Sequence, residues 1–220
     1  ASLLASRELL VATRRNLENQ VRGLLKTTGI RLGKVSSGHF QAAVETAVES
    51  HAALAAVLRP LLLARAEVVK QLAGIEREVR KTARQDAIVR LLMTAPGVGT
   101  IVATRYKTVI DDPRRFPHSR QVGVYLGLTV RLTESGETSY TGRISKCGDK
   151  QLRACLYEAA NALMTRGKDC PLKRWAKRLA AKVGNKKAKV ALAHKFAVIL
   201  HRMWSDGTVF RWGEEDQAMA

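Results

Sequence analysis

Residues 44–83 read VETAVESHAALAAVLRPLLLARAEVVKQLAGIEREVRKTA, a run in which apolar side chains recur every seven residues. The first register of this repeat holds Val44, His51, Leu58, Arg65, Leu72 and Val79, and the second holds Val48, Ala55, Leu62, Val69, Glu76 and Ala83. Nine of these twelve positions are apolar, which predicts one hydrophobic stripe along a helix. Because Pro60 donates no helical hydrogen bond, we expect a kink or a restart there.

A second apolar stripe precedes this run and predicts another helix, which begins near residue 1. It consists of Leu3, Leu10, Leu17 and Leu24. Glycines at positions 29, 33 and 38 then predict a turn between the two helices. The two helices either fold back on each other as an antiparallel pair or pair with a second chain as a coiled coil, and the sequence leaves both open. We assign residues 1–88 to this coiled-coil helical arm.

The composition points to a globular protein with a polyanionic partner. The chain has 220 residues, 46% of them hydrophobic and only 5% aromatic, which favours a helical core and excludes global disorder. Lys and Arg number 38 against 19 Asp and Glu, a net charge of +19 that repels itself unless a polyanion binds. No apolar run approaches the ~18 residues of a membrane span, and no signal peptide opens the sequence, so we expect an intracellular protein.

The three cysteines argue against a disulfide framework or a zinc site. Cys147, Cys155 and Cys170 are an odd number, form no Cys-x-x-Cys pair and have no histidine at ligand spacing. We therefore expect reduced, buried thiols and no metal site.

Residues 91–110, LLMTAPGVGTIVATRYKTVI, have the pattern of a helix-hairpin-helix unit. The turn consists of Pro96, Gly97, Val98 and Gly99. Two glycines allow the backbone to approach a phosphate, and the unpaired N–H groups that open the second helix lie at its positive dipole end. Such a turn would hold the DNA backbone without reading bases. The alternative is an ordinary helix-helix turn whose glycines only allow close packing.

Residues 131–146 form a polar segment, predicted to be a loop or a small β-hairpin over a helical base. Its hydroxyl side chains lie between Arg131 and Arg143 in the sequence. Guanidinium groups stabilise charge on phosphoryl oxygens while an oxygen nucleophile attacks, so this composition indicates a phosphate site. Composition does not choose among the candidate nucleophiles, which are Ser135, Ser139, Tyr140 and Ser145. Ser145 is also a candidate cap of the next helix.

Positive charge is concentrated in the helices predicted for residues 149–206. Between Thr165 and Arg202, twelve lysines and arginines face Asp169 alone, a net charge of +11. Pro171 and Gly184 divide this region into three helices, each with one apolar and one basic face. The basic faces would release counterions on binding nucleic acid. The predicted DNA contacts here and in the preceding segment are Lys146, Lys150, Arg153, Lys173, Arg174, Lys177, Arg178, Lys186, Lys187 and Lys189. His194 and His201 are interpreted as packing or phosphate-facing residues.

Taken together, four motifs resemble the C-terminal half of the insertion-sequence transposases of the one-hundred-ten and one-hundred-sixteen group, which are RNA-guided DNA recombinases. The motifs are LLMTAPGVGTIVA, FPHSRQVGVYLGLT, TESGETSYTGRISKCGDKQLRACLYEAANALM and KRWAKRLAAKVGNKKAKVALAHKFAVILHRMW. The segment from Leu17 to Leu25 resembles the coiled-coil region of that family. The resemblance implies that the serine of the Glu134-Ser135-Gly136 element, Ser135, forms a covalent phosphoserine with DNA.

The fold prediction is therefore mainly α: a long antiparallel helical hairpin or coiled coil, then a helical transposase C-terminal domain at residues 89–212 and a tail at 213–220. Family members begin with a RuvC-like domain whose acidic residues bind Mg²⁺, and we expect this chain to lack it. Asp86, Asp111, Asp112 and Glu134 are not expected to replace it. We expect no cofactor in this chain, and Mg²⁺ only together with the acidic domain.

The resemblance implies a DNA recombinase that cleaves and exchanges strands, with DNA, a structured guide RNA and further copies of itself as partners. It implies a prokaryotic, cytoplasmic and nucleoid-associated protein with no membrane contact. The alternative is a non-catalytic DNA- or RNA-binding and oligomerisation module.

Overall fold

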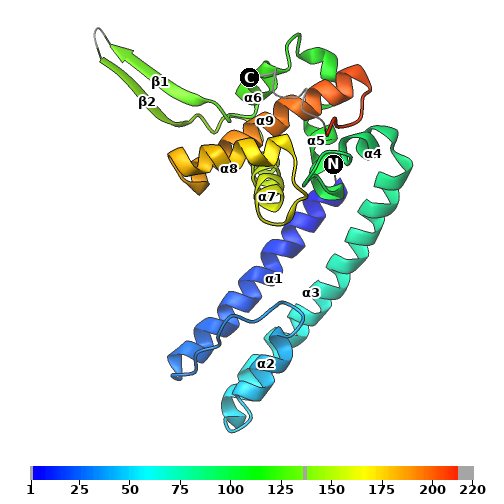
Figure 1. Cartoon of the computed structure of the whole chain (residues 1–220). Helices are drawn as coiled ribbons and strands as arrows, with labels where there is room; N and C mark the ends of the chain where they lie inside the picture. Colours follow the sequence, from blue (N-terminus) through cyan, green and yellow to red (C-terminus); the bar gives the residue numbers. More distant parts are fainter. Residues whose placement is uncertain (1, 136–137, 213–220) are drawn as a thin grey trace. The chain divides into compact units, whose positions relative to one another are not determined.

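The computed structural model describes residues 2–135 and 138–212, and its fold is mainly α, as predicted (Figure 1). The helices are α1 (Ser2–Thr27), α2 (Phe40–Ala47), α3 (Ala52–Gln85), α4 (Ala87–Leu92), α5 (Thr100–Ile110), the 3-10 helix η1 (Pro113–Arg115), α6 (Arg120–Tyr125), α7 (Lys150–Arg166), α8 (Pro171–Val183) and α9 (Asn185–Asp206). The strands are β1 (Val130–Ser135) and β2 (Thr138–Ile144). The chain divides into two compact units, Ala1–Val79 and Arg80–Ala220.

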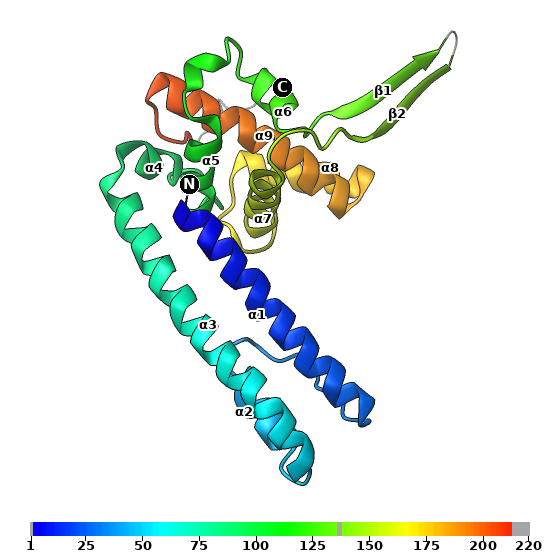
Figure 2. The same ribbon diagram turned by 180° about the vertical axis from the view of Figure 1, so that it is seen from behind.

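The first unit is built on an antiparallel pair, α1 and α3, which run side by side (Figure 2). An ion pair of 2.8 Å joins Arg7, early in α1, to Glu76, late in α3. A second, of 2.7 Å, joins Glu18 to Arg65, near the middle of α3. Residues later in α1 thus contact residues earlier in α3, as expected for an antiparallel pair. The helical hairpin therefore closes within one chain. Pairing of this arm with a second chain stays a prediction.

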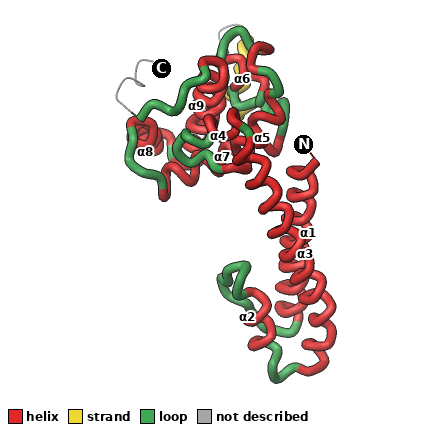
Figure 3. The backbone as a smooth tube through the Cα atoms, turned by 90° about the vertical axis from the view of Figure 1, so that its right-hand side faces the viewer, coloured by secondary structure: helices red, strands yellow, loops and turns green. Residues whose placement is uncertain are grey.

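The prediction of one continuous helix from residue 44 is wrong. α2 ends at Ala47 and α3 begins at Ala52, and Figure 3 shows α2 as a separate short helix. The separation does not expose the predicted apolar stripe, because α2 folds onto the same core as the helical pair. The buried residues of that core are Val21, Leu25, Phe40, Val44, Val48, Leu58 and Leu62.

We expected a kink or a restart at Pro60. The restart is wrong, because α3 runs unbroken from Ala52 to Gln85 with Pro60 inside it, and the kink stays a prediction. A proline at this position removes the hydrogen bond to the carbonyl of Ala56. Both Ala56 and Pro60 are exposed. The carbonyl that the proline leaves free therefore lies at an exposed position, where solvent can replace the lost hydrogen bond.

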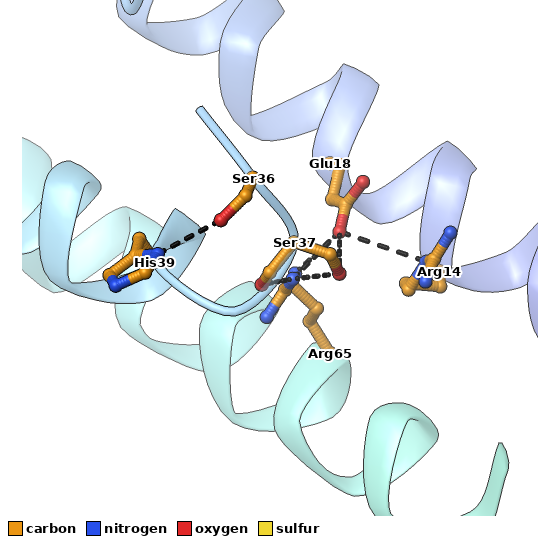
Figure 4. Close-up of polar contacts among 6 residues, drawn as sticks. All are labelled: Arg14, Glu18, Ser36, Ser37, His39 and Arg65. Atoms are coloured by element: carbon orange, nitrogen blue, oxygen red, sulfur yellow. Dashed lines mark hydrogen bonds and ion pairs between the residues drawn. The ribbon is translucent and has the colours of Figure 1, made fainter. Parts of the chain in front are cut away.

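Arg65 explains how a charged residue occupies a core register of the repeat. Its side chain is only 4% exposed. It donates to a carboxylate oxygen of Glu18 at 2.9 Å and to the carbonyl and hydroxyl of Ser37 (Figure 4). Its guanidinium also lies 4.8 Å from the centre of the Phe40 ring. Arg14 approaches the same Glu18 oxygen at 3.8 Å. A buried cation is tolerated because charge and hydrogen-bonding capacity are both satisfied.

The second unit packs its helices around α9, which lies against α4, α6, α7, α8 and η1. Fully buried side chains at its centre include Leu92, Tyr106, Ile110, Leu126, Leu152, Leu156, Leu163, Leu192 and Phe196. The hydroxyl of Tyr106 donates to the Ala197 carbonyl at 2.7 Å, and burial raises the pKa of Tyr106 well above its ordinary value. This hydrogen bond connects α5 to the middle of α9.

Helix boundaries in the basic region are as predicted. Pro171 is the first residue of α8, where its missing N–H has no helical partner to lose. Gly184 separates α8 from α9 at a φ of +84°. His201 packs as predicted: its Nε2 lies 2.9 Å from the Pro113 carbonyl oxygen and its Nδ1 lies 2.9 Å from the Ser119 hydroxyl.

The polar segment is a β-hairpin, one of the two predicted forms. β1 and β2 are antiparallel, with Val130 opposite Ile144 and Ser135 opposite Thr138. Ser145 does not cap the next helix. Asp149 caps α7 instead, accepting from the backbone N–H of Leu152 at 2.6 Å.

The cysteines are free, but the expectation of three buried thiols is wrong. Cys170 is buried and Cys155 half-buried, whereas Cys147 is exposed in the segment between β2 and α7. Within the described ranges, no three His, Cys, Asp or Glu residues gather in a group that would hold a metal ion. None of the helices described is long and apolar enough to cross a membrane.

Candidate nucleic-acid interface

The base of the hairpin is held by close contact between two sequence motifs, LGLT at 126–129 and SKCG at 145–148. The N–H of Ser145 donates to the Thr129 carbonyl at 2.9 Å, and that of Lys146 donates to the Gly127 carbonyl at 3.0 Å. Gly127 and Gly148 both have positive φ. A Cβ on Gly127 would overlap backbone atoms of Lys146 and Cys147, and a Cβ on Gly148 would overlap the carbonyl oxygen of Tyr125. These glycines therefore set the close approach that fixes where the hairpin leaves the helical base.

Arg153 stabilises the same junction. Its Nη1 donates to three carbonyl oxygens, those of Leu126 at 3.2 Å, Cys147 at 2.6 Å and Gly148 at 2.9 Å. A guanidinium group placed in this way supplies hydrogen-bond donors to loop carbonyls that have no secondary-structure partner. Arg153, which was predicted to bind DNA, therefore donates hydrogen bonds to backbone groups of its own chain.

Ser135 is exposed and lies at the last position of β1, at the far end of the hairpin. Arg131 lies four residues earlier, which is about 13 Å along an extended strand. Its Nη2 donates to the Ser145 carbonyl at 2.9 Å, and Arg143 is exposed near the same end of the ladder. The hairpin therefore places both arginines at its base and does not bring them to Ser135.

The remaining candidate nucleophiles have partly described positions. In the strand register, Ser139 lies opposite Glu134 and Tyr140 lies opposite Thr133, but their side chains lie outside the described atoms. Gly136, of the Glu-Ser-Gly element, also lies outside the described residues.

The turn between α4 and α5 combines packing with an open helix end. Gly97 has a φ of +81°, and a Cβ there would lie 2.6 Å from the Ala159 carbonyl oxygen of α7. Pro96 and Val98 are buried. Gly99 precedes α5 with open space around it and no side chain capping the first N–H groups. Close packing thus accounts for Gly97, and phosphate binding at the N–H groups after Gly99 stays a prediction.

A groove with a volume of about 1380 Å³ lies where the hairpin base meets α6, α8 and α9. Its cationic side chains are Arg120, Arg143, Lys146, Lys186, Lys187 and Lys195. Its apolar side chains are Val124, Leu128, Val130, Ile144, Trp175, Val190, Ala191 and Val198. Among the described residues that line it, none is acidic. The groove is therefore lined by apolar and by cationic side chains, and we call the apolar set its floor and the cationic set its rim.

The predicted DNA contacts differ in exposure and in the contacts that they make within the chain. Lys173 is 9% exposed and its Nζ donates to the Gly167 carbonyl at 2.6 Å, so its charge serves the α7–α8 connection. Arg174 pairs with Asp169 at 2.7 Å. The exposed members are Arg131, Arg143, Lys146, Lys150, Arg174, Lys177, Arg178, Lys186 and Lys187, and Lys189 is half-buried.

Two groove cations, Arg120 and Lys195, were not predicted from the sequence. Lys195 lies among apolar residues of α9, and its Nζ lies 4.3 Å from the centre of the Trp175 ring. Arg120 opens α6, far from the basic segment in the sequence. Their charge was the only signal in the sequence, because the groove forms where the hairpin base, α6, α8 and α9 pack together.

His194 belongs to the groove and is neutral near pH 7. Burial of the imidazole lowers the pKa of His194 from its ordinary value of 6.5. Its ring lies directly against Gly123 of α6, where a Cβ would overlap it. The groove's positive charge at neutral pH therefore comes from its lysines and arginines.

The carboxylates of Asp86 and Asp112 are engaged by neighbouring groups of the chain. Although burial acts in the opposite direction, hydrogen bonds from Lys107 and from the first turn of α4 lower the pKa of Asp86. Asp112 is paired with Arg114 at 2.8 Å, and this hydrogen bonding lowers the pKa of Asp112. Both carboxylates already serve helix ends and ion pairs.

Comparisons with known proteins find similarity to transposases. Residues 89–178 match the model described as "Transposase IS116/IS110/IS902 family". A "Probable family 20 transposase" of Pseudomonas aeruginosa is 31% identical over 94% of this chain and 63% of its own length. The "Transposase for insertion sequence element IS1111A" of Coxiella burnetii is 30% identical over 96% of this chain and 60% of its own length.

A third relative, the "Transposase for insertion sequence element IS1328" of Yersinia enterocolitica, is 34% identical over 64% of this chain and 43% of its own length. The chain therefore spans less than two thirds of the length of these relatives. The matched segment contains the α4–α5 turn, the hairpin and its base, α7 and most of α8. Residues 89–178 of this chain are thus similar to the IS116/IS110/IS902 transposase family, which is the family that the sequence motifs resemble.

Proposed function

We propose that this chain is the serine-bearing part of an insertion-sequence DNA recombinase, which cleaves and exchanges DNA strands through a covalent phosphoserine. The observation that carries the proposal is the exposed Ser135 at the end of a hairpin whose base adjoins a wholly cationic rim. The similarity to transposases over most of the chain supports the same reading.

The proposed reaction is an in-line displacement at phosphorus. The Oγ of Ser135 attacks a DNA phosphate and forms a P–O bond, the P–O bond to one deoxyribose oxygen breaks, and the proton of Oγ passes to a general base while the leaving oxygen takes up a proton. A deoxyribose hydroxyl of another strand then attacks the phosphoserine, which restores Ser135 and joins the strands. The energy of the phosphodiester is retained throughout, so exchange needs no external energy source.

In this proposal the exposed cations bind DNA phosphates and take no part in the cleavage reaction. Lys186 and Lys187 open α9, and Lys177 and Arg178 lie on α8, all exposed to solvent. Contacts of this kind fix a duplex in place through its phosphates without reading its sequence. The acidic residues that activate the serine belong, in this proposal, to a separate acidic domain.

A structured guide RNA and further copies of the chain complete the proposed assembly, which acts at the bacterial nucleoid. The guide supplies sequence selection, because the described cations contact phosphates. The exposed apolar side chains of the arm, among them Leu9 and Leu63, provide surface for pairing with another copy.

The second candidate is a non-catalytic nucleic-acid-binding and oligomerisation module. It is favoured by the distance between Ser135 and the two arginines at the hairpin base, which leaves the serine without a described activating partner.

A trapping experiment separates the two candidates. The chain is incubated with insertion-end DNA, guide RNA, Mg²⁺ and the acidic domain of a related transposase in trans, and protein–DNA adducts are resolved under denaturing conditions. We expect an adduct with the native chain and with Ser145→Ala, and none with Ser135→Ala, while all three bind DNA equally. An adduct that survives Ser135→Ala contradicts the proposal, and the lack of any adduct with the native chain favours the binding module.

A further inference from the structure

We propose that the groove between the hairpin base, α6 and α9 binds an unpaired DNA strand, with bases on its floor and phosphates on its rim. This inference rests on the proposed function, because transfer of a strand between duplexes requires that bases be unpaired. The rim shares Lys186 and Lys187 with the basic faces already described, and the apolar floor adds a means of distinguishing single strands from duplexes.

The floor of the groove is unusual for a surface that binds duplex DNA. Val124 is 58% exposed and Val130 is 49% exposed, and both lie beside cations rather than in a core. Trp175, Val190 and Val198 extend the same apolar strip along α8 and α9. Side chains of this kind gain free energy only when an apolar surface covers them.

The rim determines the charge of the occupant. Arg143 and Lys146 stand at the hairpin end of the groove, and Lys186 and Lys187 stand at the start of α9. Because none of the described lining residues is acidic, an occupant must bring negative charge along its length. His194, neutral near pH 7 because burial lowers its pKa, adds a polar ring without further charge.

A single DNA strand meets both requirements at once. Its phosphates are spaced along one edge and its base faces are apolar and accessible, whereas a duplex stacks its base faces internally and shows only edges and phosphates. Binding sites for unpaired strands elsewhere combine a cationic track with surfaces on which bases stack.

The position of the groove relative to Ser135 fits this role. Val130 begins β1 at the groove, and Ser135 ends the same strand. Five strand residues span about 17 Å, which equals about five stacked nucleotides of one DNA strand. A strand held in the groove is therefore within reach of the proposed nucleophile.

The test compares three DNA probes, whose bases are accessible, absent or paired. The probes are a fluorescent oligothymidine of about twelve nucleotides, within the range bound by single-strand sites, the same oligonucleotide with abasic residues, and a duplex of the same length. Anisotropy titrations give the three affinities for the whole chain. We expect the native chain to bind the base-bearing strand at least about fivefold more tightly than the abasic strand.

The double variant Val124→Ser with Val130→Ser removes apolar floor and leaves every cation in place. It is expected to lower the affinity for the base-bearing strand about fivefold, to the level of the abasic strand, with duplex affinity changed less than about twofold. The matched control is Val209→Ser, a valine that is 59% exposed in the same unit but does not line the groove. It is expected to leave all three affinities unchanged.

Two results would overturn the inference. If the abasic strand binds as tightly as the base-bearing strand, the rim alone contacts DNA. If the floor variant, shown by circular dichroism to be folded, keeps its affinity for the base-bearing strand, the floor serves another occupant such as an acidic protein segment. Duplex affinity and the Ser135 adduct report on the proposed function separately, so the two proposals fail independently.

Discussion

At the scale of single residues, the buried Arg65 is the clearest case of charge used for structure. We expect Glu18→Ala to lower the free energy of unfolding of the arm by on the order of 3 kcal/mol, because it leaves this cation buried without its carboxylate. Glu67→Ala is the matched control, since Glu67 forms a solvent-exposed pair with Lys70, 3.9 Å apart. That control is expected to change stability by less than about 0.5 kcal/mol in urea titrations. Equal losses in both variants would contradict a structural role for the Glu18–Arg65 pair.

The burial of His194 leads us to expect a lower free energy of unfolding in mild acid. Burial lowers its pKa from 6.5, so the folded state favours the neutral ring, and this contribution is complete above pH 6.5 and lost as the pH falls through the folded pKa. Urea unfolding at pH 7.5 and pH 5 measures the loss. His194→Gln is expected to make the chain less sensitive to acid, and His118→Gln, at an exposed position, is expected to retain the full sensitivity. Acid sensitivity unchanged by His194→Gln would contradict the assignment.

At the scale of elements, the two glycines of the α4–α5 turn differ in what surrounds them. Gly97→Ala is expected to reduce stability by about 1–3 kcal/mol, because it introduces a Cβ at positive φ and against the Ala159 carbonyl. Gly99→Ala has open space and is expected to change thermal unfolding little. If both variants unfold at the native temperature, the turn does not pack on α7 as described.

The sequence predicted those elements whose boundaries have a local cause. Pro171 and Gly184 mark the ends of α8 because one cannot continue a preceding helix and the other adopts positive φ. The break between Ala47 and Ala52 was missed, since no proline or glycine marks it and the cause is the packing of α2 onto the core. The restart at Pro60 did not occur, because an exposed proline can be accommodated within a helix whose freed carbonyl is open to solvent.

The candidate site was predictable in composition but not in geometry. Charge identified Lys186 and Lys187 correctly as exposed cations, yet it included Lys173 and Arg153, whose donors are used by loop carbonyls of the same chain. Such use depends on tertiary contacts, which composition does not report. The groove was not foreseen, because its walls come from segments separated by many residues in the sequence.

At the scale of the whole molecule, a net charge of +19 predicts strong salt dependence of DNA binding. The double variant Lys186→Ala with Lys187→Ala is expected to weaken binding to unrelated sequences equally and to reduce the slope of log affinity against log salt by about two. Lys70→Ala, at an exposed lysine of the arm, is expected to leave the slope unchanged. A flat salt response of the native chain would contradict the cationic interface.

The most direct test of the central claim, that Ser135 is the nucleophile, is mass spectrometry of the trapped protein–DNA adduct. Trypsin cleaves after Arg131 and Arg143 and releases the peptide at 132–143, LTESGETSYTGR, which also holds Ser139 and Tyr140. Fragmentation of this peptide locates the residual nucleotide. We predict the nucleotide on Ser135, and none on the peptide from a reaction without the acidic domain, because an unassisted serine is a weak nucleophile. A nucleotide on Ser139, Tyr140 or any peptide outside 132–143 would contradict the claim.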